Sequence, residues 1–279
     1  PLSRRLVQMS GTARESWREV LRREGTKIIL TIISLVSFLL IWWGLSLYLD
    51  SMGLRYLPAP DVVFEAFLVS LSGDPLTHNP LLNHILASLN RFVWGFALAV
   101  ALAVPLGLLM GGSKYARYLG MPASEILRPI PPLALAGFFF AAFGVLYGPI
   151  VTVFYGVFFP VLYNVMFGVR SVDPILLDAA RTLGASRTQM FGKVILPFTI
   201  PYLMTGISIG LGVGWMVIVA AEWIAAPGGG VGALILSTYT NGMYSYMFVG
   251  IIAVAILGIL TTSLSRLLET IVADRMGMK

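Results

Sequence analysis

The chain has 279 residues, of which 57% are hydrophobic and 11% are charged, and its mean hydropathy is +0.86. Soluble domains carry about 25% charged residues, so this composition excludes an ordinary soluble domain and indicates one integral membrane domain. The absence of cysteine excludes disulfides and thiol or cysteine–metal chemistry. The formal net charge is +6, and the charged residues flank apolar segments. We therefore assign this charge to membrane topology and not to nucleic-acid binding.

Six apolar stretches are long enough to cross a bilayer, because a crossing helix needs about 20 residues. We therefore predict an all-α, polytopic membrane protein. Its six predicted spans are Ile28–Leu49, Leu86–Met110, Ile126–Val145, Pro149–Val169, Phe198–Ala221 and Tyr246–Leu267. The third span is the least regular because three prolines crowd its start at positions 129, 131 and 132, although membrane helices tolerate proline where neighbours satisfy the freed carbonyls.

Basic residues set the predicted orientation. With the N-terminus in the cytoplasm, all but two of the 19 Lys and Arg residues fall on the cytoplasmic side, the exceptions being Arg55 and Arg91. This bias follows the positive-inside rule, so both termini are predicted to be cytoplasmic. We divide the chain into a basic N-terminal segment (1–27), a transmembrane domain (28–268) and a cytoplasmic tail (269–279). Two interpretations of Thr12–Lys27 are open, a helix lying along the membrane surface and a disordered basic tail.

The polar segment of residues 173–197 lies between two spans and has the pattern of two short helices. Asp173 followed by proline is typical of a helix start. Gly184 stands where helices often end in a left-handed residue. Ser186 and Gln189 form a capping box that starts a second helix, which we expect to stop near the final proline of the segment. The segment is therefore predicted to hold a defined shape, which indicates docking to another protein.

Within this segment the chain reads Asp178-Ala179-Ala180, three residues, Gly184, nine residues, Val194, one residue, and Leu196-Pro197. This spacing resembles the E-A-A…G…I-x-L-P motif of permease subunits in bacterial ABC importers, with Asp for Glu and Val for Ile. The resemblance implies coupling helices over about 174–196 that sit in a groove on a separate ATPase subunit. It implies that Asp178 engages that partner or caps its helix. The coupling residues implied are Asp178, Ala179, Ala180, Leu183, Gly184, Ala185, Leu196 and Pro197.

Three further stretches, LPAPDVVFEAF, RPIPPLALAGFFFAAFG and IVAAEWIAAPGGGVGALI, resemble the nitrate, sulfonate, taurine and bicarbonate branch of these permeases. The resemblance runs from about Leu57 onward and implies a type I permease fold that imports a small anion. It also implies a bacterial inner-membrane assembly containing a second permease copy, two ATP-binding cassette subunits and an external substrate-binding protein. ATP and Mg would bind the ATPase, and this chain would hold no cofactor.

The chain has no phosphate loop of its own. The nearest string, GLLMGGSK over Gly107–Lys114, lacks the Gly-Lys-Ser/Thr order and ends a span instead of following a strand. The chain is therefore expected to be a non-catalytic subunit. The alternatives are a secondary transporter or channel, which would need buried ion-coupling groups or inverted repeats, and a membrane scaffold without transport.

Polar and small residues within the spans are the candidates for a translocation pathway, because polar groups in a membrane are costly. An ion pair is the alternative for the Arg and Glu among them, and plain helix packing is the alternative for the glycines. The candidates are Arg91, Tyr155, Asn164, Gly210, Gly214, Trp215 and Glu222.

Two other features lie in predicted loops. His78 and His84 fall in one polar loop with no third ligand, so we expect solvated side chains and no metal site. The glycine-rich stretch Pro227–Leu236 is predicted to form a short re-entrant or surface helix that meets a binding protein.

Overall fold

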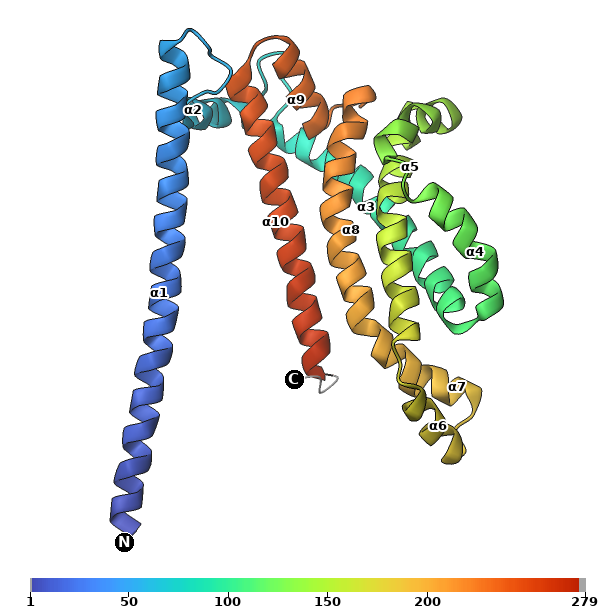
Figure 1. Cartoon of the computed structure of the whole chain (residues 1–279). Helices are drawn as coiled ribbons and strands as arrows, with labels where there is room; N and C mark the ends of the chain where they lie inside the picture. The colour runs from blue at the N-terminus through green and yellow to red at the C-terminus, as the bar shows by residue number, and fades with distance from the viewer. Residues whose placement is uncertain (1, 276–279) are drawn as a thin grey trace. The chain divides into compact units, whose positions relative to one another are not determined.

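The structure is a computed structural model that describes the backbone of residues 2–275 and the side chains of residues 25–267, 269–271 and 274. All regular elements in this range are helical, which confirms the all-α prediction. In chain order they are α1 (Leu2–Ser51), α2 (Pro60–Ser70), α3 (Leu81–Gly112), α4 (Lys114–Leu127), α5 (Pro132–Arg170), α6 (Pro174–Thr182), α7 (Arg187–Met190), the π-helical turn η1 (Phe191–Ile195), α8 (Leu196–Ile224), α9 (Val231–Thr240) and α10 (Tyr244–Arg275) (Figure 1).

The chain forms two compact units, residues 1–65 and 66–279. In the first unit, the apolar part of α1 exposes almost all of its large side chains, as expected of a helix that faces lipid. The chain after α1 turns back along it, since Trp42 and Ser46 donate to the carbonyls of Pro58 and Leu57 at 3.0 and 2.8 Å. The backbone of residues 12–27 is helical and continuous with α1. The side chains up to residue 24 lie outside the described part, so the surface placement of this segment stays a prediction.

The core of the second unit lies where α3, α5 and α8 pack together. Small residues on α3 let its backbone approach α5 closely. A Cβ atom added at Gly95 would lie 2.6 Å from the Ile150 carbonyl, and one at Gly107 would lie 2.8 Å from Cβ of Val165. In Figure 1, α6 and α7 lie at the same end of this unit as the last turns of α10, while α9 lies at the opposite end. We call these the coupling end and the outer end.

Among the residues that the structure describes, five helical stretches are long and apolar enough to cross a membrane, namely Gly25–Ser51, Leu81–Gly112, Pro132–Arg170, Arg187–Ile224 and Tyr244–Ile271. The third predicted span has no separate counterpart among them. Its residues are divided between the end of α4 and the first arm of α5, which breaks at Gly144 with φ 76° and ψ 171°. The second arm of α5 contains the fourth predicted span. The count of six spans and the cytoplasmic placement of both termini are compatible with this arrangement and stay predictions.

Candidate functional site

Helix α6 begins and ends as its sequence predicts. The Asp173 side chain accepts a hydrogen bond from the Ile175 amide at 2.8 Å, which caps the first turn. No residue of α6 is buried, and the apolar side chains of Ile175 and Leu183 are 73% and 87% exposed. Helix α6 therefore presents apolar side chains at the surface, and its predicted role in docking stays a prediction.

The corner after α6 is a Schellman motif. Gly184 has φ +77°, and its amide donates to the Arg181 carbonyl at 2.9 Å. The Ala185 amide donates to the Ala180 carbonyl at 3.0 Å. These two bonds satisfy carbonyls that the helix end would otherwise leave free. A Cβ atom at Gly184 would meet no atom within 4 Å, so this position requires glycine for its backbone conformation and not for space.

The second helix starts as predicted but does not stop at Pro197. Ser186 and Gln189 form a complete capping box, with bonds of 2.9 and 3.3 Å between each side chain and the other residue's amide. The chain then stays helical from α7 through η1 into α8, so the expected stop is wrong. Pro197 lies in the first turn of α8, just after the wider turn η1, in which Leu196 donates to the Phe191 carbonyl. Proline has no amide hydrogen to donate to the preceding turn. The wider π-helical turn before it lets the helix continue without that bond.

The predicted coupling residues fall into two groups. The first group forms one exposed helix and corner, in which Asp178 pairs with Arg181 at 2.8 Å instead of capping the helix. This group consists of Asp178, Ala179, Ala180, Leu183, Gly184 and Ala185. The second group, Leu196 and Pro197, lies at the start of α8. A continuous helix therefore joins the exposed corner to a membrane span.

A buried polar cluster lies at the outer end, and Arg91 and Glu222 are at its centre. Arg91 Nη1 donates to Glu222 Oε1 at 2.6 Å and to the Gly229 carbonyl at 2.7 Å, while Nη2 donates to the Pro227 carbonyl at 2.6 Å. Ser88 donates to both carboxylate oxygens of Glu222 at 2.9 and 2.8 Å. The ion pair considered for these two residues is thus confirmed, and a role for either in the pathway stays a prediction.

The glycines of the outer loop are required by this cluster. Gly228, Gly229 and Gly230 all have positive φ, and a Cβ atom at Gly230 would lie 2.5 Å from Cδ of Glu222. The Gly232 amide donates to Glu222 Oε2 at 2.9 Å. The loop leads into α9, so the predicted short helix exists. One side of α9 is buried against the rest of the unit and the other side is at the surface.

His84 joins the same cluster, which contradicts the expectation of a solvated loop side chain. It lies in the first turn of α3 and is buried. Its Nδ1 lies 3.1 Å from the Gly230 carbonyl oxygen and 3.2 Å from the Gly230 amide, and its Nε2 lies 3.2 Å from Asp74 Oδ2. The prediction failed because α3 begins at Leu81, ahead of the predicted span. His78 does lie in the loop and is exposed.

Asp74 is the acidic end of this chain of contacts and is itself buried in the loop before α3. Burial alone would raise its pKa. Hydrogen bonds from the Thr77 side chain, from the amides of Thr77 and Leu76 and from His84 outweigh burial, and they lower the pKa of Asp74 from 3.8 to about 2. The carboxylate therefore stays ionised and organises the loop. Within the described residues, no group of three or more His, Cys, Asp or Glu side chains is arranged to hold a metal ion.

The remaining pathway candidates do not join this cluster. Tyr155 donates to the Leu127 carbonyl at 2.5 Å and so fastens α4 to α5. Asn164 donates to the Pro160 carbonyl of its own helix at 2.8 Å. Trp215 is buried, stacks on Phe92 with ring centroids 4.4 Å apart, and donates to Thr261 at 3.0 Å. These contacts are structural, and a pathway role for these three residues stays a prediction.

The glycine candidates on α8 serve helix packing. A Cβ atom at Gly210 would lie 3.0 Å from Val157 of α5, and one at Gly214 would lie 2.7 Å from Phe92 of α3. The packing alternative is therefore confirmed for both glycines, and a role in lining the pathway stays a prediction.

Sequence reasoning missed Asp74, His84 and Ser88 as members of the outer cluster. One signal was present, because His84, Ser88 and Arg91 are spaced by four and three residues and so share one face of a helix. Three polar residues on one face at the start of an apolar helix indicate a buried polar contact.

A family model described as the binding-protein-dependent transport system inner membrane component matches residues 103–276. The chain belongs to this family. The taurine transport system permease protein TauC of Escherichia coli (strain K12) is 36% identical to the chain over 248 residues, covering 88% of each protein. The nitrate import permease protein NrtB of Synechocystis sp. is 31% identical over 227 residues, covering 77% of the chain and 80% of NrtB.

The fold agrees with a solved structure. An inward-facing conformation of the MetNI methionine ABC transporter superposes with a TM-score of 0.58 at 20% identity, covering 69% of this chain and 95% of that chain. This binding-protein-dependent permease is therefore a multi-pass membrane subunit of an ABC importer, in the branch that includes the taurine and nitrate permeases. It is non-catalytic, and the family assignment decides against a secondary transporter, a channel or a scaffold. The family also implies an ATPase and a substrate-binding protein as partners.

Proposed function

We propose that this permease conducts a small anion or sulfonate-bearing molecule, of the taurine, sulfonate, nitrate or bicarbonate type, across a bacterial inner membrane. The proposal is supported by the names of its relatives TauC and NrtB, which transport taurine and import nitrate. A sulfonate and a nitrate are both compact anions whose charge is spread over several oxygens. Two permease copies pair around the pathway, two ATP-binding cassette subunits bind ATP and Mg, and an external binding protein delivers the anion.

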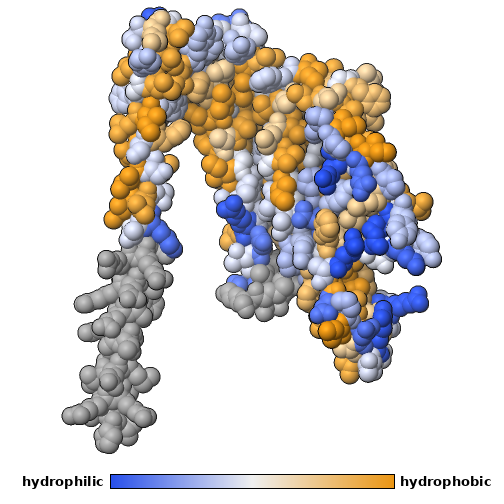
Figure 2. All heavy atoms as spheres, in the orientation of Figure 1, coloured by the Kyte–Doolittle hydropathy of each residue, from blue (hydrophilic) through white to orange (hydrophobic). Residues whose placement is uncertain are grey.

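The observation that carries the coupling role is the exposed helix and corner of residues 174–185 at the coupling end. Figure 2 shows hydrophilic side chains gathered at this end of the second unit, interspersed with apolar ones. The amides of Leu183, Gly184 and Ala185 all donate to carbonyls of α6, which holds the corner in shape, and Leu183 is almost completely exposed. A rigid projection with an apolar tip suits a groove on an ATPase.

The continuous helix through α7, η1 and α8 gives the coupling segment a mechanical link to the membrane. When ATP binding draws two ATPase subunits together, each docked corner moves with its subunit. Because no flexible loop separates the corner from α8, that movement reorients α8 as a rigid body and opens the pathway outward.

The decisive experiment measures ATPase binding and coupled transport in the reconstituted complex. Gly184→Val and Ala179→Arg are expected to abolish co-purification of the ATPase or to uncouple ATP hydrolysis from uptake. Gly53→Val is the matched control, because Gly53 has φ +78° and open space around it, as Gly184 does. Normal binding and transport in both coupling variants would contradict the coupling role.

The substrate class is tested on the partner binding protein. Calorimetry against nitrate, bicarbonate, taurine and alkanesulfonates is expected to find tight binding of one of these ligands, each of which carries an anionic oxygen group. Tight binding of a cation or a neutral sugar would contradict the anion proposal and leave the coupling role untouched.

A further inference from the structure

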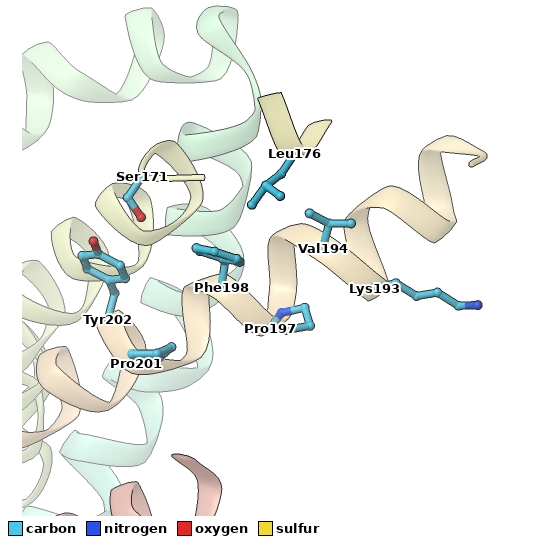
Figure 3. Close-up of a pocket in the computed structure, with 8 residues that line it drawn as sticks. All are labelled: Ser171, Leu176, Lys193, Val194, Pro197, Phe198, Pro201 and Tyr202. Carbon is cyan, nitrogen blue, oxygen red and sulfur yellow. The ribbon is translucent and has the colours of Figure 1, made fainter. Parts of the chain in front are cut away.

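A cavity of about 500 Å³ lies between the coupling helix α6 and the start of α8. Its walls are mostly apolar and come from both sides of the coupling segment, with Leu176 facing Val194 and Phe198 across the space (Figure 3). Its volume falls within the range of about 300–1,000 Å³ that is typical of ligand sites. The lining residues are Ser171, Leu176, Lys193, Val194, Pro197, Phe198, Pro201 and Tyr202.

The cavity lies at the coupling end, where α5 ends and α8 begins. Ser171 directly follows the end of the α5 span at Arg170, and Pro197 to Tyr202 form the first turns of α8. Phe198 and Tyr202 are 44% and 38% exposed, so the cavity has aromatic walls that remain open to the surroundings. Tyrosine side chains such as that of Tyr202 concentrate where acyl chains meet headgroups.

The charges around the cavity favour an anion. Lys193 extends from the edge of the cavity, away from its apolar walls (Figure 3). Among the described residues, no carboxylate lies within ion-pair distance of Lys193 or of the neighbouring Arg170. Neither acid of the adjoining segment lines the cavity, and Asp173 caps α6 while Asp178 pairs with Arg181. The cavity thus combines an apolar interior with an unneutralised basic edge.

We propose that this cavity binds an anionic phospholipid of the inner leaflet, with an acyl chain between Leu176 and Phe198 and the phosphate at Lys193. An apolar space alone would accept any hydrocarbon, but basic groups at headgroup depth select anionic lipids. The bound lipid joins α6 to α8 and so stiffens the coupling segment. Placing it in the inner leaflet depends on the proposed function, which assigns the coupling end to the cytoplasm.

The test is native mass spectrometry of the full chain in detergent, with phosphatidylglycerol and phosphatidylcholine of identical acyl chains. We expect the chain to retain phosphatidylglycerol in preference. Lys193→Gln is expected to weaken that retention by about fivefold, the effect of one basic residue near a membrane surface. Lys114→Gln is the control, because Lys114 is another exposed lysine and does not line the cavity. Leu176→Trp, which narrows the space between residue 176 and Phe198, is expected to reduce retention further.

Equal retention of the two lipids, or equal effects of the two lysine substitutions, would overturn the proposal. So would a Leu176→Trp variant that keeps its phosphatidylglycerol but no longer binds the ATPase, because the cavity would then hold a segment of the partner. Lys193 is exposed, so Lys193→Gln is expected to fold normally. This variant therefore tests the proposal even if Leu176→Trp fails to fold. Lipid binding is measured on the permease alone, so its failure is distinct from a failure of ATPase coupling.

Discussion

Two arginine–carboxylate pairs in this permease have nearly the same geometry and opposite surroundings. Arg91 and Glu222 lie 2.6 Å apart at the outer end, with side chains 8% and 0% exposed. Arg181 and Asp178 lie 2.8 Å apart at the coupling end, with side chains 62% and 71% exposed. The distance alone therefore says little about what each pair contributes.

The difference lies in what surrounds the charges. The buried pair is completed by Ser88, by the Gly232 amide and by the carbonyls of the outer loop, so that four parts of the chain depend on it. The exposed pair spans one turn of a single helix and involves no other element. The outer cluster holds the fold together, whereas the coupling segment keeps its surface available to a partner.

The largest expected effect follows removal of one buried charge. Glu222→Ala leaves Arg91 buried without a carboxylate, which typically costs about 3–5 kcal/mol. We expect loss of monodisperse protein, measured by size-exclusion chromatography after graded heating in detergent. The double variant Arg91→Met with Glu222→Leu removes both charges and is expected to recover much of the stability. If Glu222→Ala alone behaves as wild type, the cluster does not hold the outer end together.

The next effect separates two glycines that both have positive φ. Gly230→Ala forces a Cβ atom to 2.5 Å from Glu222, whereas Gly184→Ala meets no atom within 4 Å. Backbone strain at positive φ costs about 1–3 kcal/mol at either position, and overpacking adds about 1–3 kcal/mol at Gly230 alone. Thermal unfolding of the two variants is expected to rank Gly230→Ala as clearly less stable. Equal unfolding temperatures would show that the outer loop adjusts to the added Cβ atom without a loss of stability.

Asp74 gives the outer end a pH dependence. Its pKa in the folded protein is about 2, below the ordinary 3.8, so the folded state binds this proton less readily than the unfolded state does. Asp74 thus stabilises the fold by about 2 kcal/mol at neutral pH. This contribution is lost as the pH falls from about 4 to about 2. In unfolding measurements, the difference between wild type and Asp74→Asn is expected to shrink across that window, and a constant difference would contradict the assignment.

The coupling segment could be predicted because its signals are local. Asp173, Gly184 and the Ser186–Gln189 box each act on amides or carbonyls within a few residues, and the sequence displays them side by side. The π-helical turn was not predicted, because Pro197 reads as a helix stop unless the wider preceding turn is known. Local capping chemistry therefore gave the shape of this segment but not its connection to α8.

The outer cluster could be predicted only in part because its partners are far apart in sequence. Arg91 and Glu222 are separated by 131 residues, and His84 and Gly230 by 146. Comparable membrane depth suggested the ion pair, but nothing in the sequence placed Asp74 or the glycine loop around it. The same limit applies to Gly210 and Gly214, whose packing partners on α5 and α3 are visible only in the fold.

The smallest expected effect on stability is that of the exposed pair. Asp178→Asn removes one charge of a pair that water screens well, so the free energy of unfolding should change by less than about 0.5 kcal/mol. Co-purification of the ATPase with the same variant tests whether the Asp178 carboxylate contacts the partner. A loss of ATPase binding without a loss of stability would place Asp178 in the docking surface. A stability loss comparable to that of Glu222→Ala would mean that the coupling end, like the outer end, depends on its charges for folding.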